Sequence, residues 1–179
     1  MVSQIVLIVV LVFGQLAIAD NKADALKGLG FSESDLKPSA DLQKTLDDRR
    51  YYLKQHQVWG LIAAGTMVAA FVSGGEESLP PEHPYFAGLA VASYAASAVT
   101  SWLAPDVPSA KISGGSAWHR RLVYIHLPGM ILTPILGYMA AKKFEKSEGL
   151  DTPEKYHRDV AGITAGTLVL SAILVSFEF

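Results

Sequence analysis

The chain has 179 residues, of which 50% are hydrophobic and only 18% are charged, whereas about a quarter of the residues of an average soluble domain are charged. This composition indicates a membrane protein. The 15 basic and 17 acidic residues give a net charge of −2, which excludes the strongly basic surface of a typical nucleic-acid-binding protein. The chain has no cysteine, so disulfides, iron–sulfur clusters, thiol catalysis and thioether-attached haem are excluded as well.

The N-terminal segment is typical of an export signal. Residues 5–13 form the apolar run IVLIVVLVF, and Ala17-Ile18-Ala19 after it has the small-x-small pattern of a cleavage site. We expect a signal peptide over residues 1–19; an uncleaved anchor is the alternative, because no Lys or Arg precedes the run. Residues 20–55 are polar and are predicted to form a partly helical extracytoplasmic tail, with one helix that starts near Ser39 and runs into the first apolar span.

Four apolar stretches follow, and residues 56–179 are therefore predicted to be a domain of four transmembrane helices. Each stretch has about 18 to 20 residues, which matches a hydrocarbon thickness of roughly 30 Å. Short connections favour antiparallel neighbours, so the expected fold is all-α: an integral membrane four-helix bundle, up-down and antiparallel. The basic residues of the loops alone weakly favour the opposite orientation, so the orientation rests on the signal peptide. The stretches are residues 57–74, 85–104, 122–141 and 160–177.

All five histidines lie at or near the ends of these spans. Ionisable side chains near membrane depth usually face the bundle interior and mark a functional site, although any one of them can also be a solvated interfacial residue. In the expected orientation the histidines sort into two layers, each drawn from a diagonal pair of helices. Two imidazoles on diagonal helices suit the axial ligation of a planar macrocycle. The histidines are His56, His83, His119, His126 and His157.

The third span carries two of these histidines on one face. His119 and His126 are seven residues apart, which places them about 20° apart around a helix and roughly 10 Å apart along it. Only one of them is expected to ligate a given metal. His126 is favoured because it lies inside the apolar span, where an unpaired imidazole is costly. His119 is the alternative ligand if the helix sits deeper in the membrane.

Basic residues adjoin the layer that contains His119. Arg120 and Arg121 follow it directly, and Arg49, Arg50 and Lys54 precede the first span. Arginine binds carboxylates such as haem propionates through two parallel hydrogen bonds, whereas anchoring to lipid phosphate is the simpler alternative for each of these residues.

A short internal repeat lies at matched distances from two histidines. Residues 64–68 read AGTMV after His56, and residues 165–169 read AGTLV after His157. The repeat indicates similar surroundings for a histidine at each membrane face, with chance as a serious alternative in alanine-rich sequence.

The chain resembles the cytochrome b561 family of membrane b-type cytochromes, which are four-helix haem bundles. The resemblance rests on HQVWGLIAAGTMVAAFVSG from His56, HRRLVYIHLPGMILTPILGYMAAKK from His119 and HRDVAGITAGTLV from His157, and it covers residues 50–177. It implies transmembrane electron transfer by one or two b-type haems. Carried over by position, it implies that His56 and His126 ligate one haem iron and that His83 and His157 ligate the other.

The resemblance implies an electron-transport protein, and a redox protein or a quinol is its expected partner. We expect a multi-pass protein surrounded by membrane lipid in the bacterial inner membrane, with the N-terminal tail extracytoplasmic. Whether it is an oxidoreductase depends on whether it oxidises a small molecule itself, and no substrate pocket is readable from the sequence. The alternative function is a non-haem subunit for assembly or scaffolding of a larger membrane complex. A histidine-based proton or metal-ion path is a third hypothesis, which the absence of a carboxylate between the two layers disfavours.

Overall fold

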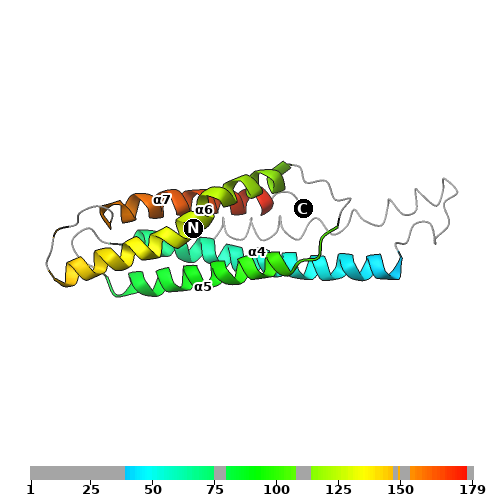
Figure 1. Cartoon of the computed structure of the whole chain (residues 1–179), viewed down its shortest axis with the longest axis horizontal. Coiled ribbons are helices and arrows are strands. Elements are labelled where there is room, and N and C mark those ends of the chain that lie inside the picture. Colours follow the sequence, from blue (N-terminus) through cyan, green and yellow to red (C-terminus); the bar gives the residue numbers. More distant parts are fainter. Residues whose placement is uncertain (1–38, 75–79, 108–113, 147–148, 150–153, 177–179) are drawn as a thin grey trace, which may run out of the picture. The chain divides into compact units, whose positions relative to one another are not determined.

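The computed structural model describes residues 39–74, 80–107, 114–146, 149 and 154–176. All regular structure in these ranges is helical (Figure 1). Four of the helices are long and apolar enough to cross a membrane, which confirms the predicted all-α class and the four expected spans. The predicted signal peptide and the tail as far as residue 38 lie outside the described residues. The helices are α4 (Ala40–Ser73), α5 (Glu82–Leu103), α6 (Gly114–Glu145), the 3-10 helix η1 (Glu154–Tyr156) and α7 (His157–Ser176).

Helix α4 begins beside the predicted position. The Ser39 hydroxyl accepts a hydrogen bond from the Leu42 N–H at 3.3 Å, which satisfies one of the free donors of the first turn. The helix then continues for 34 residues, or about 51 Å at 1.5 Å per residue, without a break between its polar and apolar parts. Its turns up to Asp47 belong to one compact unit, and residues 48–178 form a second unit, which contains the histidines.

Prolines fix the ends of α5. Pro81 occupies the N-cap with helical dihedral angles, and a proline in the first turn costs little because the N–H groups there have no partner within the helix. Pro84 is tolerated for the same reason. Since α5 begins at Glu82, His83 lies in its first turn. The helix ends at Leu103, and Pro105 soon after it disfavours the helical conformation at Ala104, which is extended.

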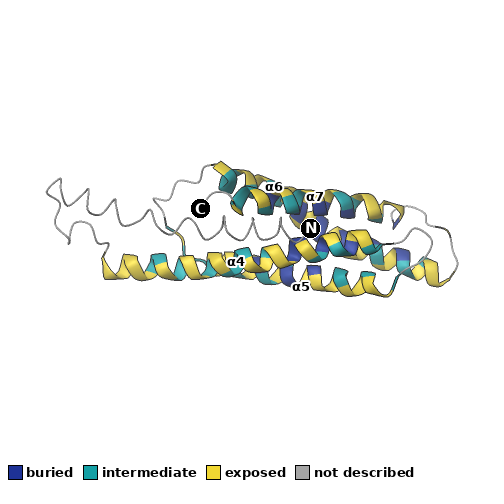
Figure 2. Cartoon of the chain, turned by 180° about the vertical axis from the view of Figure 1, so that it is seen from behind, coloured by how far each residue is buried: buried dark blue, intermediate teal, exposed yellow. Residues whose placement is uncertain are grey.

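The buried residues of the bundle are mostly small or polar, together with a few larger apolar ones such as Met67, Met130 and Leu168, and many large apolar residues are exposed. Figure 2 shows the buried positions on the helices, with exposed positions on the same helices. This is the arrangement expected of helices surrounded by lipid, in which small residues allow close packing and polar groups bond to one another inside. Several buried hydroxyls donate to carbonyls of the preceding turn of their own helix. The buried polar residues of the bundle include Ser93, Ser97, His126, Thr133, Thr164 and Ser171.

Contacts between the helices show which pairs run antiparallel. Along α6 and α7, Gly129 lies against Thr164 and Gly137 lies against His157, so residue numbers rise on one helix as they fall on the other. Helices α4 and α5 are paired in the same sense, because the His56 ring bonds to Ser97 and Gly74 lies beside His83.

An ion pair anchors the chain just before α7. The Lys143 ammonium pairs with the carboxylate of Glu154, which is buried in η1. Since His157 follows η1 directly, this pair between α6 and η1 helps to fix where α7 begins.

The closest helix approach generates the first testable prediction. A Cβ atom on Gly129 would overlap Oγ1 of Thr164 and lie 3.0 Å from its Cβ, and Thr164 has a stiff β-branched side chain that is only 1% exposed. We expect Gly129→Ala to lower the free energy of unfolding by about 1–3 kcal/mol, the usual cost of overpacking. Thermal unfolding in detergent, followed by circular dichroism, measures the change.

Gly166→Ala is the matched control, because a Cβ there meets nothing within 4 Å. Equal melting temperatures for the two variants would contradict the close packing of α6 on α7.

Candidate histidine sites in the bundle

Three histidines gather around one level of the bundle, and we call them the His56 layer: His56 of α4 with His119 and His126 of α6. The ring centroids of His56 and His119 are 5.7 Å apart, and those of His119 and His126 are 6.2 Å apart. The His119 ring is therefore a neighbour of both other rings. The layer draws its imidazoles from α4 and α6.

Two histidines form a second group, which we call the His83 layer: His83 of α5 and His157 of α7. Their ring centroids are 6.0 Å apart. The His157 ring bonds to the carbonyl of Thr133, which is fourteen residues after His119 on α6, or roughly 21 Å along that helix. The two layers therefore lie at well-separated levels.

Hydrogen bonds fix the tautomer of three of the five rings. Nδ1 of His56 lies 2.9 Å from the Ser97 carbonyl, Nδ1 of His83 lies 2.8 Å from that of Ala70, and Nδ1 of His157 lies 3.0 Å from that of Thr133. A carbonyl only accepts, so each Nδ1 carries the proton and donates it. The neutral ring then keeps its lone pair on Nε2, which is the atom that binds a metal, and the Nδ1 bond holds the ring in place.

The two rings on α6 are held by side chains instead. Nδ1 of His119 lies 2.5 Å from the hydroxyl of Ser171 on α7, and Nδ1 of His126 lies 2.8 Å from the hydroxyl of Tyr94 on α5. A hydroxyl can donate or accept, so both tautomers are open to these rings. All five histidines are thus bonded through Nδ1 to a neighbouring helix.

His126 is the most deeply buried of the five, with 3% of its surface exposed. Within the described part of the chain, its Nε2 atom is buried without a hydrogen-bond partner, as is the hydroxyl of Thr133. A buried polar atom without a partner is costly and marks a place where a ligand or an ordered molecule is expected.

The structure sorts the histidines as the sequence predicts, with one layer drawn from the first and third spans and the other from the second and fourth. It differs in the neighbour of His56. The sequence favours His126 over His119 as the ligand that is paired with His56, whereas in the structure the ring next to His56 is that of His119 and the His126 ring lies beside Tyr94. The reason is height along α6: the two residues share a face, and His126 lies about two turns nearer the middle of the bundle.

The predicted cationic partners lie at the same end of α6 as His119. Arg120 and Arg121 are both exposed, and the guanidinium of Arg121 lies 4.9 Å from the centroid of the Trp118 ring. Arg49, on α4, donates to the carbonyl of Pro105 at 2.5 Å and so connects α4 to the end of α5.

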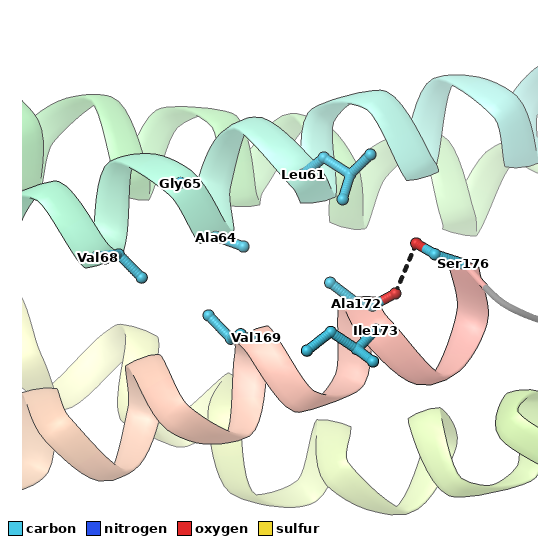
Figure 3. A pocket seen from close by; sticks show the side chains of 8 residues that line it. All are labelled: Leu61, Ala64, Gly65, Val68, Val169, Ala172, Ile173 and Ser176. Atoms are coloured by element: carbon cyan, nitrogen blue, oxygen red, sulfur yellow. Dashed lines mark hydrogen bonds between the residues drawn. The ribbon is translucent and has the colours of Figure 1, made fainter. Parts of the chain in front are cut away.

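An open apolar pocket of about 460 Å³ lies between α4 and α7, and none of the residues that line it is a histidine (Figure 3). The two repeated segments contribute Ala64, Gly65 and Val68 from one helix and Val169 from the other. The only polar side chain of its lining is Ser176, which donates to the carbonyl of Ala172. Residues of the repeat thus line an apolar pocket, and no ionisable side chain is among the residues that line it.

Sequence reasoning did not single out the residues that hold the rings. Tyr94, Ser97 and Ser171 bond directly to imidazoles, and the Thr133 carbonyl does so through the backbone. A signal was present, because these polar residues interrupt apolar spans and such residues usually face the interior of a membrane bundle.

Among the described residues, no group of three or more histidine and acidic side chains is arranged to hold a metal ion. Each candidate site is therefore a pair of neighbouring imidazoles, His56 with His119 or His83 with His157. Comparison of the chain with known protein families, with curated proteins and with solved structures finds no match. The function is consequently inferred from the geometry of the two layers.

The Tyr94 contact generates a second prediction. Tyr94→Phe removes the bonding partner of His126 Nδ1 and leaves a buried imidazole without hydrogen bonds to the described residues, which costs about 1–3 kcal/mol. We expect a lower melting temperature in detergent. Tyr85→Phe, on the same helix but 69% exposed, is the control and is expected to melt like the unchanged protein; the same melting temperature for both variants would mean that the hydroxyl of Tyr94 contributes nothing.

Proposed function

We propose that the protein is a membrane-bound b-type cytochrome that transfers electrons between two haems, one in the His56 layer and one in the His83 layer. The observation that carries the proposal is the pairing of imidazoles from different helices, at two levels, with Nε2 left free in the rings whose tautomer is fixed.

The spacing of the rings fits a metal between them. Metal–imidazole bonds of about 2 Å, together with the half-width of each ring, give centroids roughly 6 Å apart for two imidazoles on opposite sides of one metal. The pairs His56–His119 and His83–His157 have 5.7 and 6.0 Å. Two imidazoles from the protein would be enough to hold a haem.

The chain's own residues would do three things for the haems. The Nδ1 bonds orient the rings and raise the basicity of Nε2; the small residues of the interior leave room beside the backbone; and the exposed guanidinium groups of Arg120 and Arg121, next to His119, suit the propionates of the haem in the His56 layer. When bound, haem supplies a one-electron iron couple, which two imidazole ligands keep low-spin and suited to electron transfer.

The proposal extends to the setting of the protein. Four membrane-spanning helices with one layer near each end of the bundle suit transfer across a bilayer, with a redox protein or a quinol as partner. The apolar run before residue 20 supports insertion in the bacterial inner membrane with the tail on the extracytoplasmic side.

The test is a reduced-minus-oxidised absorption spectrum of the protein purified in mild detergent, with haem counted by the pyridine haemochrome method. We expect a low-spin b-type spectrum and two haems per chain. His83→Ala and His157→Ala are each expected to lower the content of low-spin haem from two to one, because each removes one ligand of the same iron.

Gln57→Ala is the control for these variants, since Gln57 follows His56 on α4 and is not among the hydrogen-bond or ring partners of the histidines in the described part of the chain. A colourless protein would contradict the cytochrome proposal and would favour the alternative of a non-haem subunit. An unchanged spectrum in both His83→Ala and His157→Ala would contradict the site in the His83 layer.

A glycine at the His83 layer allows a subtler test. A Cβ on Gly137 would lie 2.8 Å from Cε1 and 3.2 Å from Nδ1 of His157, so Gly137→Ala displaces this ring and its bond to Thr133. We expect loss or high-spin conversion of one haem, while the haem of the His56 layer stays low-spin. Gly88→Ala, whose Cβ meets nothing within 4 Å, is expected to keep both haems low-spin; equal spectra for the two variants would exclude a role for the His157 ring.

A further inference from the structure

The two layers differ in the number of their imidazoles. The His83 layer has two, enough for the two axial positions of one iron, whereas the His56 layer has three. The third imidazole is His126, whose ring neighbours His119 and whose buried Nε2 has no hydrogen-bond partner in the described part of the chain. Leaving such an atom unpaired in the interior of a membrane bundle is costly, so its presence calls for an explanation.

Both rings on α6 are prepared in the same way for ligation. Each has Nδ1 bonded to a hydroxyl on another helix, Ser171 for His119 and Tyr94 for His126, and in each case Nε2 is the remaining ring nitrogen. Both residues occupy one face of α6. His119 is less buried than His126 and lies next to His56, at 5.7 Å between ring centroids.

We propose that His126 is a reserve axial ligand of the His56 layer, which takes the position opposite His56 when His119 leaves it. This inference rests on the proposed haem function. It assigns to His119 and His126 a single axial position that either can fill, and it makes the His56 layer, and not the His83 layer, tolerant of the loss of a ligand from α6.

The exchange conserves electrons and protons. Nε2 of His126 would hold the iron in place of Nε2 of His119, and the iron would keep its oxidation state. This requires the tautomer of His126 with its proton on Nδ1. In that tautomer Nδ1–H donates a hydrogen bond to the hydroxyl oxygen of Tyr94, at 2.8 Å. Tyr94 is therefore a positioning residue that selects the ligating tautomer.

The experiment compares His119→Ala, His126→Ala and the double variant, each purified with haem. Electron paramagnetic resonance counts low-spin and high-spin iron, and carbon monoxide binding to the reduced protein reports an open axial position. We expect both single variants to keep two low-spin haems per chain and to bind carbon monoxide no more than the unchanged protein. The double variant is expected to lose half of the low-spin signal.

His157→Ala is the matched comparison in the other layer, which has no third imidazole. We expect this single substitution alone to convert or release one haem. A protein in which His119→Ala does the same as His157→Ala has no reserve ligand, and the inference is then wrong. High-spin iron in His126→Ala would overturn it too, because His126 would then be the resident ligand.

The outcomes remain interpretable if a variant is unstable. His119→Gln keeps an amide that can bond to Ser171 but supplies no imidazole, and it replaces His119→Ala if the latter melts below the working temperature; a high-spin signal from it contradicts the reserve ligand in the same way. Absence of haem from the unchanged protein would contradict the proposed function itself, whereas a low-spin unchanged protein with a high-spin His119 variant contradicts the reserve ligand alone.

Discussion

The arrangement of this bundle depends on hydrogen bonds made by imidazole Nδ1 atoms to groups on neighbouring helices. A polar ring inside a membrane bundle must be satisfied by the protein, because lipid offers no partner. Three rings meet this requirement with backbone carbonyls and two with hydroxyls. Each bond joins two helices, so the rings that form the candidate sites also help to hold the helices in register. Packing and site geometry therefore have a common physical cause.

Small residues make this register possible. Gly129 allows Thr164 to approach α6, and Gly137 leaves room for the His157 ring. In lipid the hydrophobic effect gives helices no reason to associate, so close packing and interhelical hydrogen bonds must supply the attraction. The glycines contribute to close packing and to interhelical hydrogen bonding. The missing side chain of Gly137 leaves room for the His157 ring, which bonds to the Thr133 carbonyl on α6. The two glycines thus have a structural role that their conformational freedom alone does not explain.

The sequence was sufficient for the helices and for the two layers, and insufficient for the partner of His56. Unbroken apolar stretches of membrane length determine the spans directly, and histidines at alternating span ends sort into layers by connectivity alone. The choice between His119 and His126 depends on the height of α6 relative to α4, which side-chain packing determines and periodicity does not reveal. For the same reason the residues that hold the rings, Tyr94, Ser97 and Ser171, were visible only as polar interruptions of apolar spans.

Because the two layers contain different numbers of imidazoles, the two ends of the bundle are chemically different. The N-terminal part of α6 contributes two rings to the His56 layer. Further along the same helix, the Thr133 carbonyl accepts a hydrogen bond from His157 in the His83 layer. The order of the two layers along the bundle is therefore fixed by α6. Their assignment to the two faces of a membrane is decided separately, by the direction in which the chain inserts. Inverted insertion would leave every contact intact and yet exchange the membrane face at which each layer lies. The membrane-insertion signal would therefore decide, without altering the fold, on which side of the membrane the layer with three imidazoles is found.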